Sequence, residues 1–284
     1  MSKNRAPTKG QIEGIIKDFC ASQRNTLHLP TGEPAWEAPE IAYARGDDPL
    51  FERIKKDIGP FYWTPREAFE KAFPHLPVTS ADLTVIAYVL PQTAVTRQDQ
   101  RQETSLPAER WARSRFHGEE FNCQLRRHLA EELTQAGFPT IAPERLTDFA
   151  YRQSARFGLA SNWSERHTAW VAGLGTFGLS DGLISRRGKA ARFGSVVARL
   201  QLKPTARPYQ GHQEWCLWFA RGTCGACIRR CPVAAISPQG HDKEACFAYI
   251  RNVTAPYVHD QYGTGATPCG LCQVGIPCED RCPL

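Results

Sequence analysis

The chain has 284 residues, of which 42% are hydrophobic and 23% are charged, and its formal net charge is +6. This composition is typical of a soluble globular protein and excludes a disordered or membrane-embedded one. The longest apolar run, residues 83–90, is too short to cross a bilayer, and the start of the sequence lacks the apolar core of a secretory signal. We therefore expect a cytoplasmic protein with no membrane partner and, from its length, two domains.

The first predicted elements are two short helices separated by an irregular segment. Thr8 is a candidate N-cap for a helix whose apolar positions, within residues 12–19, share one face. Residues 26–60 are rich in Pro and Gly and show little periodicity, which predicts a long irregular segment. A capping-box signature with an early proline, at residues 64–67, predicts a short helix that runs through residue 73.

Two strands and one long helix are predicted next. Residues 83–90 form a continuous β-prone apolar run, as expected of a central strand buried on both faces. Apolar residues recur every fourth position within 119–135, and Gly137 follows as a candidate C-cap, so an amphipathic helix is predicted there. Residues 194–202 alternate in polarity and indicate another strand. The fold class is therefore predicted to be α+β.

The eleven cysteines are distributed unevenly. Only Cys20 and Cys123 precede residue 216, and both lack a CxxC context, so we expect inert thiols there. The polar stretch 203–213 contains Pro and Gly and predicts a boundary between a first domain, 1–205, and a second, 206–284. Beyond it we expect loops and turns organised by cysteine. Because the cytosol is reducing, these clustered thiols indicate metal binding rather than disulfides.

The C-terminal cysteines have the short spacing that iron–sulfur cubes need. CxxC pairs stand at 224–227 and 269–272, and Cys231 directly precedes Pro232. In two-cluster ferredoxins the cysteine before proline ligates the other cluster, which predicts a crossed assignment. One 4Fe–4S cluster is assigned to Cys216, Cys224, Cys227 and Cys278, and the other to Cys231, Cys246, Cys269 and Cys272.

Two alternatives to this assignment stay open. Cys282 also precedes a proline and could replace Cys278. Paired CxxC motifs also suit tetrahedral zinc, although zinc motifs require neither the Cys-Pro dipeptide nor eight interleaved ligands. Two adjacent clusters form a short electron-transfer path, and such a path implies an electron acceptor in the first domain.

Residues 75–284 resemble a known family. The stretch RHTAWVAGLGTFGLS at 166–180, the strand motif GSVV at 194–197 and the double-cluster tail occur in that order. They are similar to epoxyqueuosine reductases and their reductive-dehalogenase relatives. The resemblance implies a nitroreductase-like α/β domain followed by a small ferredoxin-like domain with two 4Fe–4S clusters.

The resemblance also implies a cobalamin-dependent oxidoreductase. Base-off cobalamin would lie in the first domain, and electrons from ferredoxin or flavodoxin would pass through both clusters to cobalt. Glycine lets a backbone approach a flat ligand closely, and the residues matched to the family's cofactor loop are Gly173, Gly175, Thr176, Phe177 and Gly178. A glycine-rich helix C-cap and turn is the alternative interpretation of this segment.

The chain departs from the family pattern at its expected proton donor. Epoxyqueuosine reductases have a catalytic aspartate shortly before a Glu-Arg pair. The pair here is Glu165-Arg166, and residues 159–164 contain no carboxylate. Tyr151, Ser161 and His167 are candidate substitutes. The alternative interpretations are a packing residue for Tyr151, a cap for Ser161 and a satisfied polar group for His167.

The substrate expected from these features is a small molecule. The family carries a C-terminal extension for tRNA and this sequence stops two residues after its last cysteine, so tRNA is an unlikely partner. The leading hypothesis is thus a cobalamin-dependent iron–sulfur reductase acting on a small molecule. The alternatives are an epoxyqueuosine reductase in tRNA queuosine synthesis, a reductive dehalogenase, an electron-transfer or corrinoid-reducing protein without its own substrate, and a flavin in place of cobalamin.

Overall fold

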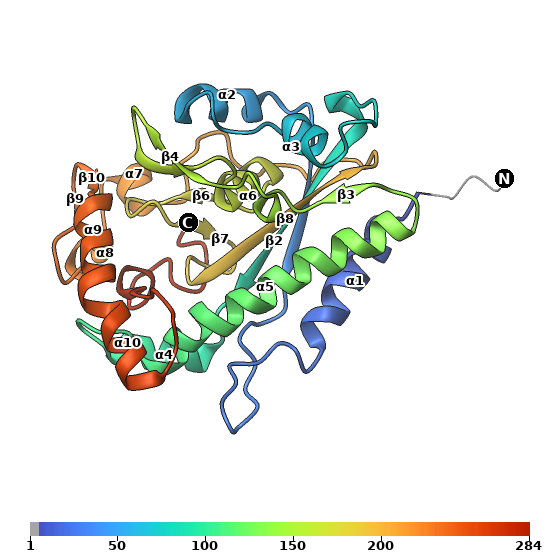
Figure 1. Cartoon of the computed structure of the whole chain (residues 1–284). Helices are drawn as coiled ribbons and strands as arrows, with labels where there is room; N and C mark the ends of the chain where they lie inside the picture. Colours follow the sequence, from blue (N-terminus) through green and yellow to red (C-terminus); the bar gives the residue numbers. More distant parts are fainter. Residues whose placement is uncertain (1–5) are drawn as a thin grey trace.

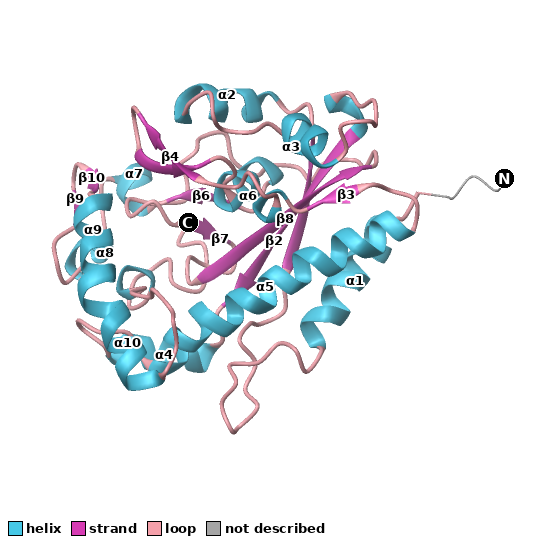
Figure 2. Ribbon diagram, in the orientation of Figure 1, coloured by secondary structure: helices cyan, strands magenta, loops and turns pink. Residues whose placement is uncertain are grey.

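A four-stranded antiparallel sheet forms the centre of the computed structural model, which describes residues 6–284 (Figures 1 and 2). The strand order is β1–β2–β8–β3. The bounds are Glu40–Arg45 for β1, Leu83–Pro91 for β2, Thr140–Ile141 for β3 and Ala191–Arg199 for β8. In the register, Ala87 of β2 faces Ala42 on one side and Ser195 on the other.

Strand β2 confirms the predicted central strand. All nine of its residues are buried, because helices cover both faces of the sheet. Val85, Ala87 and Val89 belong to one hydrophobic cluster. Their neighbours Ile86, Tyr88 and Leu90 belong to the cluster on the opposite face. The continuous apolar pattern thus reflects a three-layer arrangement rather than a parallel sheet.

Helices α1 (Lys9–Ala21) and α5 (Glu109–Gln135) cover one face, as Figure 1 shows. Thr8 caps α1 through a capping box with Gln11, as the sequence predicted for this cap. The long helix α5 begins ten residues before the predicted start, because its first three turns carry few apolar side chains. It ends where Gly137 takes the left-handed conformation with φ of 93°.

Helices α2 (Pro49–Ile58), α3 (Pro65–Ala72) and α6 (Glu165–Ala172) pack on the opposite face. The predicted capping box at the start of α3 is confirmed. The interpretation of 26–60 as irregular was wrong, because it contains both β1 and α2. Asp48 caps α2 and a proline opens its first turn, a signal that the surrounding Pro and Gly content obscured.

Short elements complete the first part of the chain. Helix α4 spans Ala94–Gln102, and single 3₁₀ turns lie at Ser80–Asp82 (η1) and Pro143–Arg145 (η2). Two hairpins pair β4 with β5 and β6 with β7. Their bounds are Tyr151–Ser154 for β4, Gly158–Ser161 for β5, Gly175–Phe177 for β6 and Leu183–Ser185 for β7.

The cysteine-rich part contains more helix than expected. Besides α7 (Leu217–Arg221), α8 (Ala226–Arg229), the β9–β10 hairpin (Ile236–Ser237, Gly240–His241) and η4 (Leu271–Gln273), residues 243–262 are helical throughout. They comprise α9 (Lys243–Tyr249), the π-turn η3 (Ile250–Thr254) and α10 (Ala255–Tyr262). The prediction of loops and turns was therefore wrong for 243–262.

The cysteine-rich part packs directly against the layered part. Trp215, Cys216 and Ile236 belong to the same hydrophobic cluster as helices α2, α3 and α6. Helix α4 adds polar contacts, since the Gln100 side-chain amide donates to the Cys269 carbonyl at 2.9 Å. The mixed α and β class is thus confirmed, while the two domain names and the boundary at 205 stay predictions. None of the helices within 6–284 is long and apolar enough to cross a membrane.

Candidate functional site

A cleft of about 530 Å³ lies between the layered part and the cysteine-rich part. One wall comes from α5, α6 and β8, through side chains such as Arg126, Glu165 and Arg192. The opposite wall comes from the cysteine-rich part and includes Cys231, Cys246, Cys269 and Cys272.

The structure brings the eight predicted ligand cysteines together in two groups. The Cys278 thiol interacts electrostatically with Cys216, Cys224 and Cys227. The Cys269 thiol interacts in the same way with Cys231, Cys246 and Cys272. The two groups adjoin, since Cys227 also interacts with Cys272. The members of each group match those of the crossed assignment, and only the second group lines the cleft.

The remaining C-terminal cysteine lies differently. Cys282 donates its thiol to the Leu284 carbonyl at 3.6 Å. Within residues 6–284, no group of three or more His, Cys, Asp or Glu side chains could hold a single metal ion. A cube presents a separate iron to each thiolate, so its ligands surround a cluster rather than converge on one point.

Burial changes the acidity of these thiols. It raises the pKa of Cys269 and of Cys278 to about 12, and that of Cys246 to about 11. Neighbouring thiols raise the pKa of each of the three further. Without a metal these groups are neutral thiols at physiological pH, and a metal that binds them must displace their protons. The donor set therefore fits a thiolate-ligated metal cluster.

Lys189 is a buried cation beside both groups. Its ammonium donates to Ser180 Oγ and interacts electrostatically with Cys272, Cys278 and Cys227. These thiols raise the pKa of Lys189 despite its burial. The charge therefore persists where thiolates would accumulate negative charge.

Most of the predicted cofactor loop does not line the cleft. Gly173 ends α6 in the left-handed conformation with φ of 96°. A Cβ on Gly175 would come within 2.2 Å of the Ile184 carbonyl, so glycine is required there by the β6–β7 hairpin. Thr176 accepts a hydrogen bond from the Trp215 backbone at 2.8 Å. Among the five predicted residues only Phe177 lines the cleft, and Gly178 does not.

The three predicted donor residues all line the cleft, in different surroundings. Tyr151 is 63% exposed on the β4–β5 hairpin. Ser161 Oγ donates to the Trp163 carbonyl at 2.5 Å. His167 packs on Phe177 and contacts Ser164 Oγ through Nδ1 at 2.9 Å. Burial lowers the pKa of His167 to about 3, so its imidazole is neutral near pH 7. The roles of all eight residues stay predictions.

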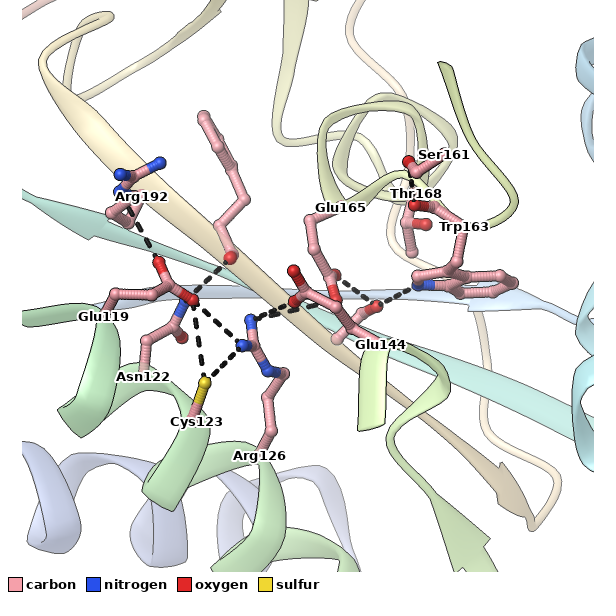
Figure 3. A network of polar contacts seen from close by, with 12 residues as sticks. Glu119, Asn122, Cys123, Arg126, Glu144, Ser161, Trp163, Glu165, Thr168 and Arg192 are labelled. Carbon is pink, nitrogen blue, oxygen red and sulfur yellow. Dashed lines mark hydrogen bonds and ion pairs between the residues drawn. The ribbon is translucent and has the colours of Figure 1, made fainter. Parts of the chain in front are cut away.

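A buried ionic network forms the inner wall of the cleft (Figure 3). Arg126 of α5 is 1% exposed and lies at its centre. Its Nη2 contacts Glu119 at 3.0 Å and its Nη1 contacts Glu144 at 2.8 Å. Glu165 Oε1 lies 3.9 Å from the same Nη1, and Arg192 lies 3.6 Å from Glu119.

Glu165 is held by a relay of hydrogen bonds. The Trp163 indole donates to Ser195 Oγ at 3.1 Å, and Ser195 donates to Glu165 Oε2. Oε1 is shielded from water and accepts no hydrogen bond within the described residues. Burial raises the pKa of Glu165 to about 8, since Arg126 compensates only part of the desolvation and Glu144 adds repulsion.

Sequence reasoning missed this network. Glu119 and Arg126 stand among the apolar positions of α5, which was the available signal, but their partners come from η2, α6 and β8. Glu165 was noted only as half of a Glu-Arg pair.

Comparisons with known proteins agree with the resemblance seen in the sequence. No family model matches the chain. A curated epoxyqueuosine reductase from Francisella cf. novicida is 30% identical over 126 residues, 42% of this chain and 33% of that protein. The chain is a relative of the epoxyqueuosine reductases. The predicted superfamily is thereby confirmed, although the match spans only about a third of the curated relative.

Solved structures extend the likeness to the fold. The epoxyqueuosine reductase of Streptococcus thermophilus matches 96% of this chain and 67% of its own, with a TM-score of 0.50 and 16% identity. The catabolic reductive dehalogenase NpRdhA matches 96% of this chain and 36% of its own, with a TM-score of 0.50 and 15% identity. These two likenesses concern the fold. The curated relative matched by sequence is a reductase, which supports the prediction of an oxidoreductase.

The expectation that tRNA is an unlikely partner is contradicted. The curated relative is an epoxyqueuosine reductase, so the sequence match points to the very family whose tRNA substrate this expectation had set aside. The expectation relied on where the sequence ends. That gives no measure of RNA binding, because a protein can read one splayed-out base in a pocket.

Proposed function

We propose that the chain is a cobalamin-dependent iron–sulfur reductase, in which electrons pass through two 4Fe–4S clusters to cobalt in the cleft. The observation that carries the proposal is the arrangement of the cysteines. Two adjoining groups of four are present, and one of them forms a wall of the cleft.

The thiol groups support an ordered electron path. Cys216, Cys224, Cys227 and Cys278 would hold the distal cluster, because none of them lines the cleft. The second group would hold the cluster next to the reacting centre. Lys189 lies beside thiols of both groups, where its charge would favour the reduced clusters.

The rim of the cleft supports a large, partly apolar ligand. Tyr151, Phe157 and Leu159 are 63%, 36% and 46% exposed, and all three lie on or between β4 and β5 at the cleft. Exposed apolar groups gathered at one opening are typical of a ligand-binding edge. Phe177 contributes a further aromatic face. These residues would hold cobalamin, which supplies a strongly reducing nucleophilic centre when bound.

The nitroreductase-like and ferredoxin-like domain assignments, with their boundary near residue 205, belong to the same proposal. The continuous core across that boundary supports rigid positioning of the cysteine groups against the cleft. Rigid positioning matters because electron transfer needs the centres at fixed separations.

The decisive experiment is anaerobic reconstitution followed by metal and cofactor analysis. About eight irons per chain are expected from two cubes. Added hydroxocobalamin should bind in the base-off form and give a Co(I) spectrum with a low-potential reductant. Iron without cobalamin binding would contradict the reductase and favour an electron carrier. A bound flavin would favour the flavin alternative, and zinc in place of iron would contradict the clusters.

Matched variants test the ligand assignment. Cys231→Ser and Cys278→Ser should each lower the iron content, since each removes a ligand from a different group. Cys123→Ser should leave it unchanged, because Cys123 contacts Arg126 and Glu119 in the layered part. Iron loss in Cys282→Ser but not in Cys278→Ser would reverse the choice of the last ligand.

The substrate is tested with two probes taken from the relatives. An epoxyqueuosine-modified RNA stem loop is the first, supported by the sequence match to an epoxyqueuosine reductase. A halogenated phenol is the second, because the fold also matches a reductive dehalogenase. Reduction of only one probe would assign the substrate class.

A further inference from the structure

The ionic network on the inner wall of the cleft contains a largely desolvated carboxyl group, that of Glu165. We propose that Glu165 is the proton-donating residue of the cleft. The inference rests on the proposed reductase function, which requires a proton for the reduced substrate.

The position of Glu165 favours this role. The residue lines the cleft whose other wall carries the second cysteine group. Its side chain is 13% exposed while Oε1 is shielded from water, so the carboxyl group lies in the wall of the cleft and is largely desolvated. Oε2 is occupied by Ser195, whereas Oε1 has no hydrogen-bond partner within the described residues. Because Oε1 accepts no hydrogen bond from the described residues and Arg126 approaches it only to 3.9 Å, little stabilises the carboxylate anion, and the protonated acid is favoured.

The surrounding charges set the proton affinity of Glu165. Its ion-pair partner Arg126 is shared with two further carboxylates and therefore stabilises a Glu165 anion only partly. The groups that face the network from the packed elements are Arg115, Glu119 and Arg126 of α5, Glu144 of η2, Arg166 of α6, Arg192 and Ser195 of β8, Tyr88 of β2, and Tyr62. Together with burial, they leave Glu165 protonated at neutral pH.

The three donors considered from sequence are less suited to the task. Tyr151 faces solvent, and Ser161 already donates to a backbone carbonyl. His167 is a neutral imidazole near pH 7 and has already lost its acidic proton, because burial lowers its pKa to about 3. A donor works best when its pKa lies near the operating pH, as the pKa of Glu165 does.

The proton-transfer step balances as follows. A low-potential one-electron donor supplies two electrons through the cysteine-held clusters. A substrate R–X accepts them, the R–X bond breaks, and X leaves with the bonding pair. The O–H bond of Glu165 breaks and a new R–H bond forms. The resulting carboxylate is stabilised by Arg126 and by the Ser195 hydroxyl until solvent in the cleft returns the proton.

The test compares Glu165→Gln with Glu131→Gln, which alters an exposed glutamate of α5 that forms an ion pair with Arg127. Infrared titration of the reconstituted protein should show a carboxylic-acid band that disappears near pH 8 in the wild type. The band should be absent from Glu165→Gln and present in Glu131→Gln. Because glutamine resembles a protonated glutamate, iron content and hydroxocobalamin binding should stay at the wild-type level.

Turnover gives the second readout. With the probe that the wild type reduces, Glu165→Gln should lower kcat by about 100-fold or more. The wild-type rate should fall above about pH 8, as Glu165 loses its proton. Ser195→Ala removes a hydrogen bond that favours the carboxylate, so this fall should move to higher pH. A structural role alone would not move it.

The outcomes separate the two proposals. A protein that binds cobalamin and iron but lacks the carboxylic-acid band, or a Glu165→Gln variant with wild-type kcat, overturns the assignment of Glu165 alone. A protein that shows the band but binds no cobalamin, or reduces neither probe, overturns the reductase and the proton donor with it.

Discussion

Arg126 offers a direct test of how the buried network contributes to stability. Replacing it with methionine keeps much of the side-chain volume but removes the cation that Glu119 and Glu144 contact at 3.0 and 2.8 Å. Glu144 would then lose its main ion-pair partner and Glu119 would keep, among the described residues, only Arg192, in a region where Arg126 itself is 1% exposed. The variant should therefore be strongly destabilised at neutral pH.

The magnitude follows from the burial. Removing one partner of a buried ion pair costs about 3–5 kcal/mol, because the remaining charge is desolvated and unpaired. The unfolding entropy is about 2.1 cal/mol/K per residue, which for 284 residues is about 0.6 kcal/mol/K. Arg126→Met should therefore lower Tm by about 5–8 °C.

The neighbouring residue supplies the control. Arg127 lies on the same helix, is 64% exposed and forms an i,i+4 pair with Glu131. Arg127→Met should lower the free energy of unfolding by at most about 0.5 kcal/mol, which corresponds to a fall in Tm of less than about 1 °C. Calorimetry of both variants at pH 7.5 decides the matter. Equal Tm values for the two would refute the view that Arg126 compensates buried carboxylates.

The loss should depend on pH in a defined direction. Burial raises the pKa of Glu144 and of Glu165 in the folded state. Such groups favour the folded protein while protonated, and their contribution is lost as pH rises from the unfolded pKa towards the folded one. Without Arg126 both carboxyl groups should hold their protons to higher pH. The Tm difference from wild type should thus be smaller at pH 5 than at pH 8.

Three further predictions concern backbone, cap and buried histidine. Gly188→Ala should lower the free energy of unfolding, measured in urea, by at least about 2 kcal/mol, because the added Cβ would come within 2.1 Å of the Glu279 carbonyl at φ of 80°. Gly222 has a φ of 63° but open space around it, so Gly222→Ala should lower the free energy of unfolding by less. Thr64→Ala should lower the free energy of unfolding by about 1 kcal/mol through loss of its capping box, and no change would contradict that. Burial lowers the pKa of His167, so the wild type should lose stability as pH falls below about 6.5, and His167→Gln should lose less between pH 7 and 5.

Local signals in the sequence specified several elements correctly. The capping boxes at Thr8 and Thr64 and the apolar run of β2 predicted their elements, because caps and continuous burial depend on neighbouring residues. The predicted strand at 194–202 was placed three residues late, since β8 ends at Arg199. Strand ends are set by pairing with β2, which no local pattern reveals.

The cysteine spacing predicted two groups of four thiols before any fold was known, and their role as cluster ligands stays a prediction. Short CxxC intervals confine neighbouring thiols to one region, and the Cys-Pro dipeptide indicated which of them cross over. Only the tertiary structure decided that Cys231, Cys246, Cys269 and Cys272 face the cleft. It also decided that Glu165 meets Arg126 there, since these residues come from different helices that the sheet holds together. Burial and charge pairing are properties of the packed chain, so the acidity of Glu165 could not be derived from its sequence neighbours.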